Sequence, residues 1–406
     1  MYVELAILAL FVFTYSLVAG RVERSVISGP MVFVVAGFLL GPPVLGWVKG
    51  DAGNEGLNVL ADLTLALVLF SDAATADLSV LKRQFQIPSR MLLLGLPGTI
   101  LLGFGLAVLT FSGLSIYEAA ILATMLAATD AALGKAVITN QTVPSRLREG
   151  LNVESGLNDG ICVPILLFFI ALTVSTEHGA HATSAMTLVV REIGIGMGVG
   201  LGVAYAGTAL LRWCLKHGWV TEIWMQVTAV ALAVAAFSIA QSLHGSGYIA
   251  AFTGGMLFGY LEKKATHKLI LAAEGTGETL ALLTWMLFGA MVIGPAFRMF
   301  SWDVVIYALL SLTVVRMVPV FLSLAGLGES VPSKLFLGWF GPRGLASIVF
   351  AIIVINEGVP HAELIALVVT CTVFMSLVLH GITANPLASW LGKKESAESI
   401  SASTHR

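Results

Sequence analysis

The sequence predicts an all-α polytopic membrane protein with about 13 transmembrane helices. The first observation is composition, because 57% of the 406 residues are hydrophobic and only 11% are charged. The mean hydropathy of +0.91 points the same way, since soluble globular domains are far less apolar. The second observation is that the apolar residues fall into runs of about 17 to 25 residues, the length that crosses a bilayer as a helix.

Thirteen such segments follow one another along the chain, and we expect all of them to be membrane helices. They lie at residues 3–19, 31–48, 57–72, 91–111, 117–138, 150–175, 187–211, 223–243, 247–261, 277–296, 304–326, 335–355 and 362–388. The first segment lacks the basic flank and the cleavage site of a signal peptide, so it is expected to remain in the protein. Residues 1–390 then form one transmembrane domain, and residues 391–406 form a short cytoplasmic tail.

The positions of Lys and Arg predict the orientation of the chain. All but six of the 22 lie in loops after odd-numbered segments or in the tail. Three of the six, Lys49, Arg191 and Arg298, border the opposite loops. Cytoplasmic loops are enriched in Lys and Arg, which places the C-terminus in the cytoplasm and the N-terminus outside, in the plasma or inner membrane. The net charge of −2 offers no basic face for nucleic acid.

The other three cations, Lys135, Arg316 and Arg343, fall inside membrane segments. A charge at bilayer depth costs at least about 2.5 kcal/mol on insertion scales and is therefore normally paired, turned toward water, and functional. Lys135 lies near the end of its segment, where its long side chain can reach the interface. Arg316 and Arg343 lie closer to the middle of theirs.

Acidic and polar residues gather in segments five and six. Thr129 and Asp130 lie in segment five. In segment six, Ser155 and Asp159 share one face of the helix with Asn158, and Glu154 flanks them. If the two segments pack side by side, these oxygen atoms converge. Carboxylate, hydroxyl and amide oxygens without His or Cys favour a hard cation such as Na⁺ over a transition metal.

Segment twelve carries the stretch GPRG at residues 341–344, and Pro342 predicts a break in the helix. If segment seven is a connector, residues 1–175 and 223–388 form two six-helix repeats of opposite orientation. Segment five then corresponds to segment twelve. Interrupted segments at matching positions of inverted halves indicate a transporter whose substrate site lies at the midplane. The evidence for a break in segment five is limited to Thr129, Asp130 and Gly134.

These residues together resemble those of NhaP-type sodium/proton antiporters, in the monovalent cation:proton antiporter family. The motifs are TD at 129–130, ESGLNDG at 154–160, Arg316 in VVRMVP, and Arg343 in GPRG. The resemblance implies a Na⁺ site that uses Asp130, Asp159, Ser155, Thr129 and Asn158. It also implies a Glu154–Arg316 ion pair that supports Asn158, and a role for Arg343 in balancing helix dipoles where broken segments five and twelve cross.

The resemblance further implies a homodimer embedded in lipid. Residues 1–72 and 223–296 form the dimer scaffold, residues 91–175 and 304–388 form a moving ion-translocating core, and residues 187–211 form the connector. Two departures from the family stand out. Ala131 follows Asp130 where relatives commonly have proline, and Asp72 lies near the place where many relatives carry an acid, which makes it a candidate for the access path.

The predicted function is therefore secondary antiport of Na⁺, or of Li⁺ or K⁺, against protons. Cation and proton compete for Asp130 and Asp159, and alternating access moves the site. The sequence contains no phosphate-binding G-x-x-x-x-G-K-[ST] motif, so ion gradients supply the energy, and no enzyme activity or cofactor is expected. Two alternatives remain open, namely a sodium-coupled organic-anion carrier with the same inverted repeats, and an intramembrane aspartyl protease.

Overall fold

A computed structural model describes residues 2–22, 25, 27–42, 44–47, 55–75, 86–177, 182–262 and 266–404 of the chain. Every regular element in these ranges is a helix, which confirms the predicted all-α class. Eight helical stretches are long and apolar enough to span a membrane, and five shorter apolar helices match the remaining predicted segments.

The helices of segments one to seven are α1 (Tyr2–Val22), α2 (Gly29–Leu40), α3 (Glu55–Thr75), α5 (Gln86–Arg90) continuing through the π-helical η1 (Met91–Gly95) into α6 (Leu96–Thr110), α7 (Ile116–Met125), α8 (Ala131–Ile138), α9 (Ser145–Glu177) and α10 (Ala182–Lys216). Segment two was expected to reach residue 48, but α2 ends at Leu40. Gly41 there takes an extended conformation, and Pro42 cannot continue a helix.

Segments eight to thirteen are α11 (Glu222–Ser242), α12 (Gly247–Leu261), α13 (Thr266–Leu287) with the π-helical η2 (Phe288–Ile293) and α14 (Gly294–Ala296), α15 (Trp302–Leu312), α16 (Val314–Ser323), α17 (Val331–Trp339), α18 (Leu345–Asn356) and α19 (Ala362–Thr404). Segment eleven was expected to be one helix. It is interrupted at Thr313, whose backbone is not helical, so that Arg316 lies in the first turn of α16.

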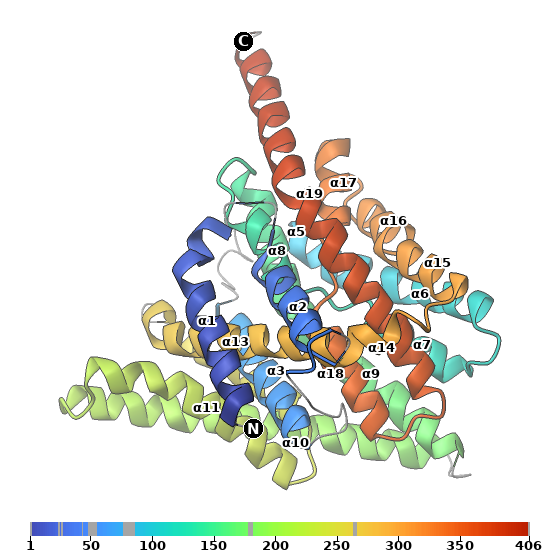
Figure 1. Cartoon of the computed structure of the whole chain (residues 1–406). Helices are drawn as coiled ribbons and strands as arrows, with labels where there is room; N and C mark the ends of the chain where they lie inside the picture. The colour runs from blue at the N-terminus through green and yellow to red at the C-terminus, as the bar shows by residue number, and fades with distance from the viewer. Residues whose placement is uncertain are drawn as a thin grey trace.

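α19 continues as a helix through most of residues 391–406, and Figure 1 shows this end protruding beyond its neighbours with the C-terminus at its tip. The first residues of the predicted tail are packed rather than solvated, because Leu391 is fully buried. Arg146 at the start of α9 bonds both Glu395 and Glu329 at 3.2 Å. Burial raises the pKa of Glu329, and the Arg146 guanidinium opposes that shift.

The helices pack in two groups that meet where α9 contacts α10, α3 and α12. In one group, α3 packs on α12 and α13, and α10 and α11 pack on α12; α10 and α11 form one edge of the molecule in Figure 1. In the other group, α9 packs on α7, and α19 packs on α15 and α18. Small residues bring the helices together, since a Cβ at Gly255 of α12 would collide with the backbone of Phe70 in α3.

Segments five and twelve are both broken, as the predicted fold requires. α7 ends at Met125, and the chain is non-helical over residues 128–130 before α8 begins. α17 ends at Trp339, and residues 340–344 are non-helical before α18. Pro342 explains the second break. The first break has no proline. At its end, Asp130 caps α8 by accepting from Leu133 N, and it bonds to the second break through its backbone N–H and Oδ2.

Alanine substitution of two glycines in α10 tests the close packing of α10 on α12. A Cβ at Gly200 would overlap Ala250 of α12, whereas a Cβ at Gly202 meets nothing within 4 Å. We expect Gly200→Ala to destabilise the protein by about 1 to 3 kcal/mol through overpacking. Gly202→Ala should be neutral or slightly stabilising, because alanine is the better helix former. Thermal melts in detergent measure both, and equal shifts for the two variants would contradict the packing described.

Candidate functional site

The candidate site lies where the two broken segments touch. The backbone N–H of Asp130 donates to the carbonyl oxygen of Pro342 at 2.8 Å. The Ser347 hydroxyl of α18 donates to Met125 O, the end of α7, at 2.8 Å. Each break thus satisfies backbone groups of the other, as interrupted helices at membrane depth require.

Asp130 accepts hydrogen bonds from the N-terminal ends of two half-helices. Its Oδ1 accepts from Leu133 N in α8 at 3.1 Å, and its Oδ2 accepts from Leu345 N in α18 at 2.7 Å. A carboxylate is favourable at a helix N-terminus, where unpaired N–H groups carry partial positive charge. Gly344 permits this approach, because a Cβ there would collide with the Asp130 carboxylate.

Asp159 lies beside this crossing, on α9. Its side chain is buried, and Asp130, Asp72 and Glu154 lie close enough for their charges to act on it. Its Oδ1 has no hydrogen-bond partner among the described residues. A buried carboxylate oxygen is costly without a partner, so this atom is open to a proton or a cation. Ser155, also buried, lies one turn before it on α9.

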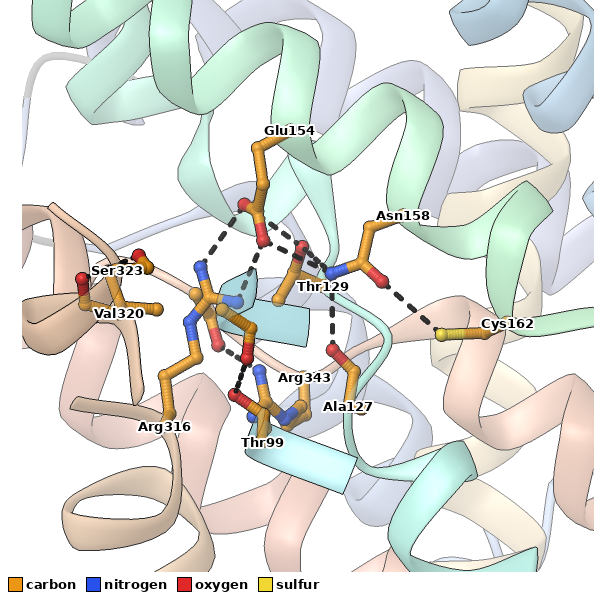
Figure 2. A network of polar contacts seen from close by, with 12 residues as sticks. Thr99, Ala127, Thr129, Glu154, Asn158, Cys162, Arg316, Val320, Ser323 and Arg343 are labelled. Carbon is orange, nitrogen blue, oxygen red and sulfur yellow. Dashed lines mark hydrogen bonds and ion pairs between the residues drawn. The ribbon is translucent and has the colours of Figure 1, made fainter. Parts of the chain in front are cut away.

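Glu154 and Arg316 form a buried bidentate ion pair next to the crossing (Figure 2). Nη1 lies 2.8 Å from Oε1 and Nη2 lies 3.1 Å from Oε2. Gly341 makes room for the guanidinium, since a Cβ at that position would overlap it. The two glycines of GPRG therefore have separate roles, one against Arg316 and one against Asp130.

Asn158 has every one of its side-chain polar atoms engaged (Figure 2). Its Nδ2 faces Glu154 Oε1 at 3.1 Å, Thr129 Oγ1 at 3.1 Å and Ala127 O at 3.2 Å. Its Oδ1 accepts from Cys162 Sγ at 3.2 Å. Because the three groups around Nδ2 can all accept, the amide orientation is fixed, and Asn158 fastens α9 to the break in segment five.

Arg343 is fully buried and donates through Nη1 to Gly341 O, on the C-terminal side of α17. A cation near carbonyl groups that have lost their helical partners is favourable. Its Nε and Nη2 have no partner among the described residues. Of the other intramembrane cations, the side chain of Lys135 lies outside the described part of the chain.

The structure therefore brings together Asp130, Asp159, Thr129, Asn158, Glu154, Arg316 and Arg343, with Ser155 one turn away on the same helix. Asp72 lies on α3 where that helix contacts Gly156 of α9, so it adjoins the site from the other group of helices. Sequence reasoning missed Ser347 and two residues of α19, Ser376 and His380. A spacing of four residues between two polar side chains in an apolar segment was the available signal.

Removing one partner of the Glu154–Arg316 pair should be more damaging than removing both. Glu154→Gln or Arg316→Met strands a buried charge, at a cost of about 3 to 5 kcal/mol, whereas the double variant strands none and should cost less. Thermal melts in detergent measure this, with Glu363→Gln, an exposed position on α19, as the control. Single variants as stable as that control would show that the pair does not support the fold.

Comparison with known proteins supports the transporter family that the sequence motifs resemble. Residues 7–390 match the family model described as "Sodium/hydrogen exchanger, transmembrane". The chain is 23% identical over 389 residues to the K(+)/H(+) antiporter NhaP of Alkalimonas amylolytica, covering 95% of this chain and 66% of that protein. It is 22% identical to a Na(+)/H(+) antiporter of Schizosaccharomyces pombe, covering 95% and 87%.

The fold matches the solved structure of the sodium proton antiporter MjNhaP1 from Methanocaldococcus jannaschii at pH 8. The TM-score is 0.78 with 20% sequence identity, over 96% of this chain and 98% of that one. The match confirms the predicted membrane fold. The family consists of transporters rather than enzymes, which rules against the aspartyl-protease alternative, and its cation/proton exchange rules against the organic-anion carrier. The chain belongs to the sodium/hydrogen exchanger family of monovalent cation/proton antiporters.

Proposed function

We propose that this chain exchanges Na⁺ or K⁺ for a proton at Asp159. The observation that carries the proposal is the buried Oδ1 of Asp159, which has no partner among the described residues while Asp130 lies beside it. A cation bound there would be shared by Asp159 and Asp130, with oxygens of Ser155, Thr129 and Asn158 nearby. The relatives named above support either ion, because one is called a K(+)/H(+) antiporter and another a Na(+)/H(+) antiporter.

Exchange follows from competition for one carboxylate. A proton on Asp159 removes the negative charge of that carboxylate and so weakens cation binding, and a bound cation disfavours the proton. The site with neither carries uncompensated buried charge, and its desolvation cost holds it back from crossing the membrane. Only the loaded site then moves between the two faces, so the gradient of one ion drives the other.

The roles of Asp130 and Asp159 differ, and this difference predicts electroneutral exchange. Both oxygens of Asp130 already accept backbone N–H bonds, and such bonds stabilise the ionised carboxylate, so we assign the exchanged proton to Asp159 rather than to Asp130. Asn158 cannot titrate. Asp159 is then the one group at the crossing that releases a proton, and one monovalent cation replaces it.

The wider arrangement is proposed on the same basis. The charge bias of the loops supports an outside N-terminus and a cytoplasmic C-terminus in the plasma or inner membrane. The group containing α1–α3 and α11–α13 would form the scaffold of a homodimer, with α10 as the connector, and the group containing α5–α9 and α15–α19 would move against it. Asp72 on α3 faces that boundary and would guide cations toward Asp159.

Replacing the two aspartates separates their roles. Asp159→Asn should abolish cation-driven proton movement, measured by acridine-orange dequenching in everted vesicles on addition of Na⁺, Li⁺ or K⁺. The Asp159→Asn protein should be as stable as the wild type, because the substitution removes a buried charge whose Oδ1 has no partner among the described residues. Asp130→Asn should also abolish exchange but should lower stability by about 0.5 to 2 kcal/mol, since it weakens the cap on two helices. Asp303→Asn, on the exposed start of α15, is the control. Normal exchange by Asp159→Asn would refute the assignment of the site.

Electroneutral exchange predicts indifference to membrane potential. In proteoliposomes loaded with a pH-sensitive dye, potassium and valinomycin impose a potential of either sign while a sodium gradient drives exchange. The proton flux that the same K⁺ gradient drives without valinomycin is subtracted, because K⁺ is itself a candidate substrate. One charge moves each way in each cycle, so we expect the same rate at both signs. Acceleration at one sign and slowing at the other would show that net charge moves.

A further inference from the structure

The break in segment twelve leaves backbone groups that need partners, and α19 supplies two of them. Ser376 Oγ accepts from the backbone N–H of Arg343 at 2.7 Å. His380 Nε2 lies 2.9 Å from the carbonyl oxygen of Trp339, the last residue of α17. Both side chains are buried. One turn of α19 therefore contacts the chain on both sides of Pro342.

The two side chains also contact each other and form a directed chain of hydrogen bonds. Ser376 Oγ lies 3.1 Å from His380 Nδ1. Trp339 O can only accept, so the contact at Nε2 is a hydrogen bond when Nε2 carries the ring proton. Ser376 Oγ accepts from Arg343, and in that tautomer its own hydrogen can be donated to Nδ1. The second neighbour of Nδ1, Ser376 O at 3.0 Å, has no proton to donate. The series runs from Arg343 N–H through Ser376 and His380 to Trp339 O.

Further contacts fix the Trp339 end of this chain. The indole Nε1–H donates to Thr383 Oγ1 of α19 at 2.9 Å. The indole also packs on the His380 ring, with 4.9 Å between the centroids. α19 therefore contacts both the carbonyl group and the side chain of Trp339 at the end of α17. These contacts restrict the backbone where the unwound stretch begins.

The stretch between Trp339 and Leu345 is also the part of segment twelve that contacts Asp130. Pro342 O accepts from Asp130 N, and Leu345 N donates to Asp130 Oδ2. A shift of this stretch would move both groups and the carboxylate they orient. The other repeat has a matching device, since Asn158 on α9, the counterpart of α19 under the inverted pairing, donates to Ala127 O in the break of segment five.

We propose that Ser376 and His380 are positioning residues of the transport site. They hold residues 339–345 in the conformation that presents Pro342 O and Leu345 N–H to Asp130, and so they set the affinity of the site for its cation. This inference rests on the proposed function of Asp130 and Asp159. It assigns to α19, an otherwise apolar helix, a role in positioning the break of segment twelve.

Hydrogen–deuterium exchange tests the hydrogen-bond chain without reference to transport. We expect faster exchange in the peptide covering residues 340–346 for Ser376→Ala and for His380→Phe, because the Arg343 amide loses its acceptor or that acceptor loses its support. Thr372→Val is the matched control, since the Thr372 hydroxyl bonds only to Val368 O of its own helix. If the rate of hydrogen–deuterium exchange in this peptide is unchanged from the wild type in both test variants, the inference is overturned.

Cation affinity separates positioning from a purely structural role. In proteoliposomes at fixed pH, Ser376→Ala and His380→Phe should raise the KM for Na⁺ about fivefold, the equivalent of one hydrogen bond of about 1 kcal/mol. His380→Gln keeps an N–H where Nε2 lies and should restore much of the affinity. Thr372→Val should keep the wild-type KM. Lower melting temperatures with unchanged KM would overturn the positioning role, whereas a wild-type protein without cation-driven exchange would refute the proposed function itself.

Discussion

Backbone polar groups at the two breaks lose their helical partners at membrane depth, and the structure depends on the partners that the protein supplies in their place. Asp130 bonds through its backbone N–H and both carboxylate oxygens, to its own half-helix α8 and to the other broken segment. Ser347, Asn158, Ser376 and His380 satisfy further groups at the breaks. The crossing is therefore a polar assembly in which moving one break disturbs the other.

Because Asp130 is committed to this assembly, it differs from Asp159 in what it can do. Asp130 contributes a fixed negative charge held between two helix ends. Asp159 keeps a buried oxygen without a protein partner among the described residues. The Glu154–Arg316 pair and Asn158 join α9 to α16 and to the first break, so Asp159 is carried on a braced helix. Under the proposed function, a small monovalent cation or one proton completes this site.

The helices were largely predictable from the sequence, and the contacts at the crossing were not. Hydropathy located the membrane segments, because a helix that crosses a bilayer needs a long apolar run. Pro342 predicted one break, because proline has no backbone N–H to continue the helix. Asp130 is a local signal for the break before Ala131 because it caps α8, but its bonds to Pro342 and Leu345 involve a distant segment. The interruption at Thr313 was not predicted. Charged residues inside segments pointed to the site, but which carboxylate oxygen is left unpartnered depends on three-dimensional contacts. Ser376 and His380 were overlooked because they are uncharged polar residues in an apolar helix.

Competition between a proton and a cation for Asp159 is tested most directly by counting the protons released when the cation binds. Calorimetric titration of the detergent-solubilised protein with Na⁺ at mildly acidic pH, repeated in buffers of different ionisation enthalpy, gives that number. Competition at one carboxylate predicts about one proton released per cation bound, and none for Asp159→Asn. Sodium binding to the wild-type protein without proton release would contradict the mechanism.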